Sequence, residues 1–145
     1  MRIANCGLRI DMTPDELKSR MRTLAVNAIR LTGELPRTQA ADVIGRQLVR
    51  SATSVAANYR SACRARSRKD FVAKMGIVEE ETDETAFWLE LLDECSFAPT
   101  ARLAPLIREA GELLAITVAS IRTARIGCRA SRANPQSAIP NLQCS

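Results

Sequence analysis

The chain has 145 residues, which is enough for one domain and too few for two substantial ones. It carries 21 Lys and Arg against 16 Asp and Glu, a net charge of +5, and no histidine, which excludes His-based nucleophile activation and imidazole metal ligands. Aromatic residues make up 3%, and Gly and Pro number six each, which argues against a base-stacking platform and a turn-rich β-sandwich. The composition therefore predicts an all-α, mildly basic protein without catalytic activity.

The cysteines and the apolar runs indicate where the protein is found. Five cysteines form no CxxC pair, and their odd number favours idle thiols in a reducing cytoplasm. Residues 1–12 are charged and lack the apolar core of a signal peptide. The longest apolar run, 113–121, is shorter than the roughly 20 residues that cross a bilayer. We expect a cytoplasmic protein that does not associate with membranes.

The first helix has a complete start signal in Thr13-Pro14-Asp15-Glu16, with Thr13 as N-cap and Glu16 closing a capping box. Gly33 and Pro36 mark its end. Between these signals apolar residues recur at alternating intervals of four and three. They are Leu17, Met21, Leu24, Ala28 and Leu31.

Three further segments repeat this spacing. A second helix is predicted from about Thr38 to about Arg64, a third from the cap at 67–70 to Leu92, and a fourth over 103–124 after a break at 99–100. A sustained 3.5-residue repeat is typical of helices that cross at about 20°. Short connections favour antiparallel neighbours, so the sequence predicts an antiparallel up-down-up-down four-helix bundle.

The chain ends differ from this core in composition. Residues 1–12 are predicted to form a flexible leader and residues 13–126 the four-helix bundle domain. Residues 127–145 contain Gly127, Pro135 and Pro140 without apolar periodicity, which predicts a disordered tail.

Charge is unevenly distributed along the chain. The net charge is +7 over residues 1–66, −6 over residues 67–100 and +4 over residues 101–145. On a helical wheel, four arginines of the second helix fall within about 80° of one another, opposite Leu48 and Val55. They are Arg46, Arg50, Arg60 and Arg64, and Arg66, Arg68 and Lys69 continue the basic region. Two interpretations stay open: phosphate contacts with an RNA or DNA backbone, or a face that is solvated or paired with the acidic third helix.

The acidic run 79–84 raises the question of a metal site. Carboxylates three residues apart, such as Glu80 and Asp83, can hold Mg²⁺. All-α nucleotide pyrophosphohydrolases pair an ExxE with a distant ExxD, whereas here only five residues separate the ExxE at 81–84 from the ExxD at 90–93. Di-iron bundles require Glu-x-x-His, and there is no histidine. We therefore expect no metal, no cofactor and no catalytic residue, and interpret the run as a solvated or salt-bridging face.

The third and fourth helices each carry a second apolar set. A helix that is apolar on two sides is either deeply buried or contacts a partner. We predict a subunit interface with Trp88 as its anchor. The predicted interface residues are Ile77, Trp88, Leu91, Cys95, Leu106 and Leu113.

Three collinear segments resemble a known family. Residues 45–60 (GRQLVRSATSVAANYR), 64–78 and 83–92 are similar to the signature of the bacterial four helix bundle proteins, also called the 23S rRNA intervening-sequence protein family. The resemblance covers about residues 13–125. Residues 59–62 (Tyr-Arg-Ser-Ala) stand where Ile-Ala-Glu-Gly is common in the family, which makes the second helix more basic. The signature positions filled here are Gln47, Arg50, Ser51, Ala52, Asn58, Ser67, Asp70 and Phe71.

The resemblance implies an up-down bundle that assembles as a ring-like homopentamer. Family members are encoded within 23S rRNA genes or elsewhere in bacterial genomes, and most have no known biochemical role. A related bundle, the accessory variability protein of diversity-generating retroelements, is a basic pentamer that binds nucleic acid and a reverse transcriptase. The leading hypothesis is thus a non-catalytic homo-oligomer that associates with RNA or DNA. A protein partner is also compatible with this hypothesis. The alternative is a scaffold whose basic and acidic faces pair between subunits.

Overall fold

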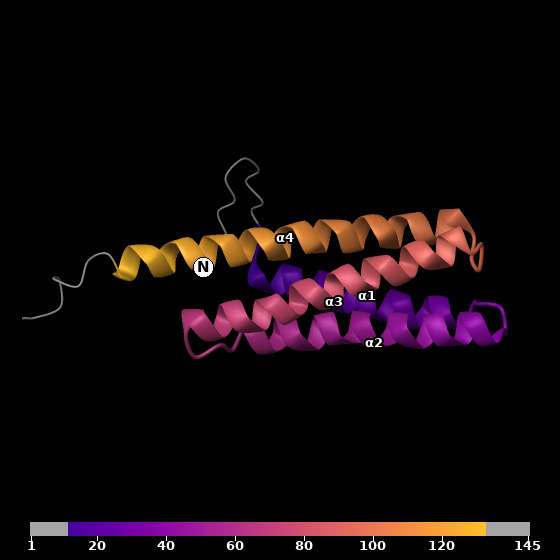
Figure 1. Cartoon of the computed structure of the whole chain (residues 1–145), viewed down its shortest axis with the longest axis horizontal. Helices are drawn as coiled ribbons and strands as arrows, with labels where there is room; N and C mark the ends of the chain where they lie inside the picture. The colour runs from indigo at the N-terminus through magenta and orange to yellow at the C-terminus, as the bar shows by residue number, and fades with distance from the viewer. Residues whose placement is uncertain (1–11, 133–145) are drawn as a thin grey trace, which may run out of the picture.

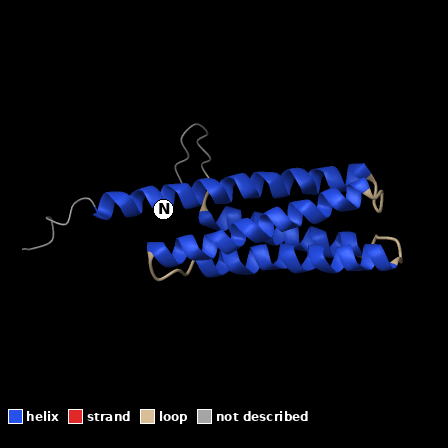
Figure 2. Cartoon of the chain, viewed as in Figure 1, coloured by secondary structure: helices blue, strands red, loops and turns tan. Residues whose placement is uncertain are grey.

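The computed structural model describes residues 12–132, with four helices joined by short connections. They are α1 (Pro14–Thr32), α2 (Gln39–Ala62), α3 (Arg68–Glu94) and α4 (Thr100–Arg132). Consecutive helices run in opposite directions (Figure 1), and the described residues contain only helices and loops (Figure 2). The predicted all-α, up-down-up-down four-helix bundle is confirmed.

The helix starts follow the capping signals in the sequence. The Thr13 hydroxyl accepts a hydrogen bond from the Glu16 backbone N–H at 3.2 Å, and the Glu16 carboxylate accepts one from the Thr13 N–H at 2.6 Å. Thr38 and Ser67 cap α2 and α3 in the same way, each accepting from a backbone N–H of the first turn. These side chains satisfy backbone donors that have no partner inside the helix, which fixes where each helix begins.

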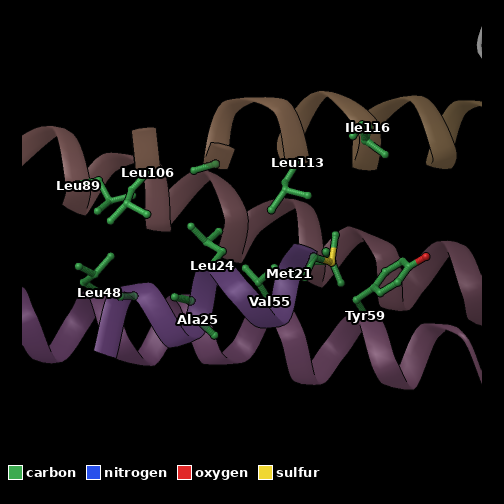
Figure 3. Close-up of a cluster of buried hydrophobic side chains, with 14 of the residues drawn as sticks. Met21, Leu24, Ala25, Leu48, Val55, Tyr59, Leu89, Leu106, Leu113 and Ile116 are labelled. Carbon is green, nitrogen blue, oxygen red and sulfur yellow. The ribbon is translucent and has the colours of Figure 1, made fainter. Parts of the chain in front are cut away.

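Apolar side chains from all four helices fill the interior of the bundle. Figure 3 shows Leu48 and Val55 of α2 close to Leu24 of α1, with Leu89 of α3 and Leu113 of α4 above them. The side chains of Leu48, Val55, Leu89 and Leu113 are each 0% exposed. The core therefore consists of the residues that recur every three or four positions.

Between residues 12 and 126, five Ser and Thr side chains are also buried, and each has a hydrogen-bond partner. Thr82, Thr117 and Ser120 donate to the carbonyl one turn earlier in their own helices. The Thr85 hydroxyl lies 3.0 Å from the Ser51 hydroxyl and so links α3 to α2 inside the core. Such pairing removes most of the cost of burying a polar group.

The four helices do not pack equally against one another. α2 packs extensively against α1 and α3, and α3 against α4, whereas α1 barely contacts α4. The bundle is therefore open along the seam between α1 and α4.

The helix at the C-terminal end is longer than the sequence predicts. α4 continues to Arg132, whereas the prediction ends the bundle domain at residue 126. Met12, placed in the leader by the prediction, packs against the core. The remaining residues of the predicted leader and tail, 1–11 and 133–145, lie outside the described part of the chain. Between residues 12 and 132, no helix is long and apolar enough to span a membrane.

Candidate nucleic-acid interface

Three of the four arginines predicted to form one face of the second helix lie on the outer side of α2, and Arg64 follows in the connection to α3. Arg46, Arg50, Arg60 and Arg64 are all exposed, while Leu48 and Val55 on the opposite side of the helix are buried. This arrangement follows from the helical repeat, because residues four and fourteen positions after Arg46 return to within about 40° of it around the helix. Helix α2 thus presents guanidinium groups to the surface along most of its length.

Arg50 is held by the acidic helix beside it. Its guanidinium donates to the side-chain oxygen of Gln47 at 3.0 Å, to Glu81 Oε1 at 3.3 Å and to Glu84. Glu84 also accepts a hydrogen bond from the indole N–H of Trp88 at 2.9 Å. These donors hold the pKa of the Glu84 carboxyl below its usual value, with Arg50 as the largest cause.

The scaffold hypothesis places the pairing of basic and acidic helix faces between subunits. The Arg50 cluster forms such a pairing within one chain. The basic α2 meets the acidic α3 at this arginine, with Glu81 and Glu84 as its partners. A guanidinium that donates to three neighbours has few donors left for a phosphate. Arg50 therefore contributes to the contact between α2 and α3. Although it lies on the basic face, part of its hydrogen-bonding capacity is already used within the chain.

The other predicted basic residues have no ion pair within residues 12–132. Arg46 lies near the start of α2, and the rest cluster where α2 ends and α3 begins. The clustered residues are Arg60, Arg64, Arg66, Arg68 and Lys69, all of which are exposed.

The connection between α2 and α3 is held in place by one acidic residue. The Asp70 carboxylate accepts a hydrogen bond from the Arg66 backbone N–H at 3.0 Å and pairs with Lys74 at 3.1 Å. These contacts lower the pKa of Asp70, with the Arg66 N–H as the largest cause. Asp70 thus fixes the backbone of the connection without neutralising the side chains of Arg66 or Arg68.

Tyr59 and Cys63 lie beside this cluster. Tyr59 is 3% exposed, and burial raises the pKa of its hydroxyl. Cys63 is an exposed free thiol at the end of α2. Tyr59 therefore offers no open ring to a ligand.

The six residues predicted to form a subunit interface are not on one surface. Ile77 and Cys95 are exposed, and Trp88 and Leu91 are half-buried. Leu106 and Leu113, in contrast, are 6% and 0% exposed and belong to the core of the single chain. Leu106 and Leu113 are buried because both apolar sets of α4 face the interior of the bundle. A partner subunit therefore cannot contact these two side chains.

Phe87 is an exposed hydrophobic residue that the sequence prediction omits. It is 52% exposed and packs edge-to-face against Trp88, with ring centroids 4.8 Å apart. Phe87 lies between Ala86 and Trp88 and does not fall on the apolar repeat of α3. This pattern could have predicted that its side chain is exposed. Ile77, which is 44% exposed, is a second exposed hydrophobic residue of α3 and lies nearly three helical turns earlier.

A groove lies along the open seam between α1 and α4. Its volume is about 830 Å³, and Met12, Leu24, Pro105 and Leu106 form its apolar lining. Arg20 closes one side by bonding both carboxylate oxygens of Glu109, at 2.8 and 2.7 Å, and reaching Glu112 at 2.7 Å. This ion-pair cluster joins two helices that otherwise barely meet, and the separation of 89 residues between its partners hides it from local sequence patterns.

The acidic run of α3 does not assemble a metal centre in the described region. Among the side chains described, those of residues 12–126, no three His, Cys, Asp or Glu come together as metal ligands. Of the run, Glu81 and Glu84 bind Arg50.

Comparisons with known proteins agree with this architecture. A family model described as the 23S rRNA-intervening sequence protein matches residues 16–119. A crystal structure of a protein with unknown function from the S23 ribosomal protein family of Bacteroides thetaiotaomicron is 31% identical in sequence, with a TM-score of 0.70. The match covers 77% of this chain and 99% of that one. No curated protein matches the chain. The chain belongs to the 23S rRNA-intervening sequence protein family.

Proposed function

We propose that this protein is a non-catalytic, cytoplasmic nucleic-acid-binding protein that contacts phosphates through the basic residues around the α2–α3 connection. The observation that carries the proposal is the exposure of Arg60, Arg64, Arg66, Arg68 and Lys69 without an ion pair within residues 12–132. Guanidinium groups bind phosphate through two parallel hydrogen bonds, and such contacts do not read sequence.

The hydrogen bonds of the neighbouring acidic residue support this assignment. Asp70, in the first turn of α3, is the acidic group next to the connection, and it is engaged by the Arg66 N–H and by Lys74. The nearby guanidinium groups thus keep their donors for a ligand. Arg46 adds a further exposed cation on the same face, whereas Arg50 is committed to α3.

A salt titration of binding tests this proposal. Fluorescence anisotropy with labelled RNA or DNA should show binding that weakens steeply between about 50 and 200 mM salt, as counterion release requires. Changing Arg60 and Arg64 together to Gln should weaken binding and flatten the salt dependence. Arg30→Gln is the matched control, because Arg30 is exposed on α1 and has no ion pair within residues 12–132. Absence of binding at low salt contradicts the proposal.

We further propose that the protein acts as a homo-oligomer. The supporting observation is a pair of exposed hydrophobic side chains on α3, Phe87 at 52% and Ile77 at 44%, of which Phe87 packs against the half-buried Trp88. Exposed aromatic side chains are enriched at protein interfaces. The family resemblance points to a pentamer.

Light scattering after size exclusion tests the assembly. Phe87→Ser should give a folded species of lower mass, whereas Val43→Ser, at another exposed hydrophobic position, should leave the mass unchanged. A wild-type monomer contradicts this proposal. If Arg60→Gln with Arg64→Gln dissociates the oligomer and leaves nucleic-acid binding unchanged, the scaffold hypothesis is favoured instead.

A further inference from the structure

The positive charge of the bundle is concentrated at one end. We call this the basic end, and it is where α2 joins α3 and where α4 ends (Figure 1). Residues 13–18, 57–74 and 120–126 form it, with nine Lys and Arg against three Asp and Glu. The rest of the described bundle up to residue 126 has eight Lys and Arg against twelve Asp and Glu. The net charge therefore changes sign along the long axis.

All three acidic residues of the basic end are engaged within the chain. Asp15 pairs with Lys18 at 2.8 Å, and the Glu16 carboxylate accepts the Thr13 N–H at 2.6 Å. Asp70 binds the Arg66 N–H and Lys74. The cations of the basic end that have no ion pair within the described residues are Arg60, Arg64, Arg66, Arg68, Lys69, Arg122 and Arg125. The charge of the basic end is thus open to an external anion.

Two of these cations come from α4, which neither the family resemblance nor the α2 pattern assigns to a site. Arg122 and Arg125 are three residues apart and so lie on the same side of the helix, and both are exposed. Figure 1 shows that α4 reaches the same end of the bundle as the α2–α3 connection. It therefore adds two exposed arginines to the basic end.

The basic end offers no open aromatic ring. Tyr59 is buried and Phe71 is half-buried against the core. The other rings of the described chain, those of Phe87, Trp88 and Phe97, lie in the later part of α3 and in the connection that follows it. Proteins that bind single strands generally stack bases on exposed rings, and this surface cannot do so.

From these observations we infer that the basic end binds double-stranded nucleic acid, and that Arg122 and Arg125 of α4 are part of the site. This inference rests on the proposed function and specifies its ligand. A duplex keeps its bases stacked internally and presents two rows of phosphates, at about one charge per 1.7 Å of axis. A surface with dense guanidinium groups can bind those phosphates. Because it has no exposed aromatic ring, it provides no ring on which unpaired bases could stack.

The experiment compares labelled duplex RNA and duplex DNA with their separated strands, using the full chain and fluorescence anisotropy across a salt series. Both duplexes should bind more tightly than the single strands, with a steeper dependence on salt. Binding should not depend on the base sequence, because phosphate contacts carry no sequence information.

The α4 arginines are tested by changing Arg122 and Arg125 together to Gln. The salt slope for the duplex should fall by about 0.9 for each phosphate that the variant no longer neutralises. The matched control is Arg108→Gln, since Arg108 is exposed on the same helix, has no ion pair within residues 12–132 and lies outside the basic end. The control should keep the wild-type slope, and circular dichroism should show that both variants are folded.

Two results overturn the inference while leaving the proposed function intact. One is equal or tighter binding of single strands that still depends on Arg60 and Arg64. The other is an Arg122→Gln, Arg125→Gln variant with the same slope as Arg108→Gln. Failure of every nucleic acid to bind at low salt overturns the proposed function itself.

Discussion

At the scale of the residue, exposure and hydrogen-bond partners decide what a charged side chain can do. Arg50 and Arg60 are both exposed arginines on the outer side of α2. Arg50 is bound by Glu81 and Glu84, whereas Arg60 has no ion pair within residues 12–132. Exposed ion pairs add little to stability, so the main consequence of the Arg50 cluster is that several of its donors are engaged within the chain, whereas those of Arg60 are not.

Burial makes an equally sharp difference among the apolar residues of α2. Leu48 is 0% exposed, and we expect Leu48→Ala to lower the free energy of unfolding by about 2–5 kcal/mol, because it leaves a cavity in the core. Val43 is 43% exposed on the same helix, and Val43→Ala should change stability by no more than about 0.5 kcal/mol. Urea unfolding followed by circular dichroism measures both. Equal effects of the two substitutions would contradict the placement of Leu48 in the core.

At the scale of the element, the helix ends are set by local hydrogen bonds. Side-chain caps begin α1, α2 and α3, as Thr13, Thr38 and Ser67 show. The end of α3 is less favourable, because Ser96 follows the helix with a φ of 54°, in the left-handed region. That conformation costs most residues about 1–2 kcal/mol and costs glycine nothing.

This geometry predicts opposite effects of one substitution at two places. Ser96→Gly should raise the free energy of unfolding by about 1 kcal/mol, because glycine adopts the left-handed conformation without strain. Ser19→Gly, at an exposed position inside α1, should lower it by about 0.5 kcal/mol, because glycine has a poor helix propensity. The urea midpoint of each variant gives the sign. A lower midpoint for Ser96→Gly would show that α3 does not end in this conformation.

At the scale of the whole molecule, ion pairs join elements that lie far apart in sequence. Arg102 at the start of α4 bonds both carboxylate oxygens of Glu34, at 2.9 and 2.7 Å, and Arg20 joins α1 to Glu109 of α4. These contacts lower the pKa of Glu34, with the Arg102 hydrogen bonds as the largest cause. The pKa values of Glu84 and Asp70 are also lowered.

These shifts determine how stability should depend on pH. A carboxyl group with a lowered pKa in the folded state stabilises it fully above the unfolded pKa, which is 4.5 for Glu and 3.8 for Asp. As the pH falls below about 4.5, the unfolded chain takes up more protons than the folded one and stability is lost. The urea midpoint should therefore be flat between about pH 5 and 8, since the chain has no histidine, and should fall by about pH 3.

Glu84→Gln provides the control for the pH series. The amide cannot titrate, so this variant should be less stable than the wild type near neutral pH and should lose less stability on acidification. A steeper loss in the variant than in the wild type would contradict the assigned role of Glu84.

The sequence by itself determined the fold class, the four helices, their order and the starts of α1 and α3. These features depend on intervals of three and four residues and on caps such as Thr13-x-x-Glu16, which act within one or two helical turns. The exposed basic region at Arg60 and Arg64 also followed from the helical repeat. The length of α4 could not be predicted from the helical repeat, because residues 127–132 continue the helix without an apolar pattern.

Only the tertiary structure decided which of these residues are available to a partner. A helical wheel gives the side on which Arg50 lies, but the position of α3 brings Glu81 and Glu84 to it. The sequence pattern alone suggests that Leu106 and Leu113 are interface residues, but the packing of α4 buries them in the core. The contact between Arg20 and Glu109 forms only across the seam between α1 and α4. Availability depends on the neighbouring helix, and residues separated by 31 to 89 positions become neighbours only when the bundle closes.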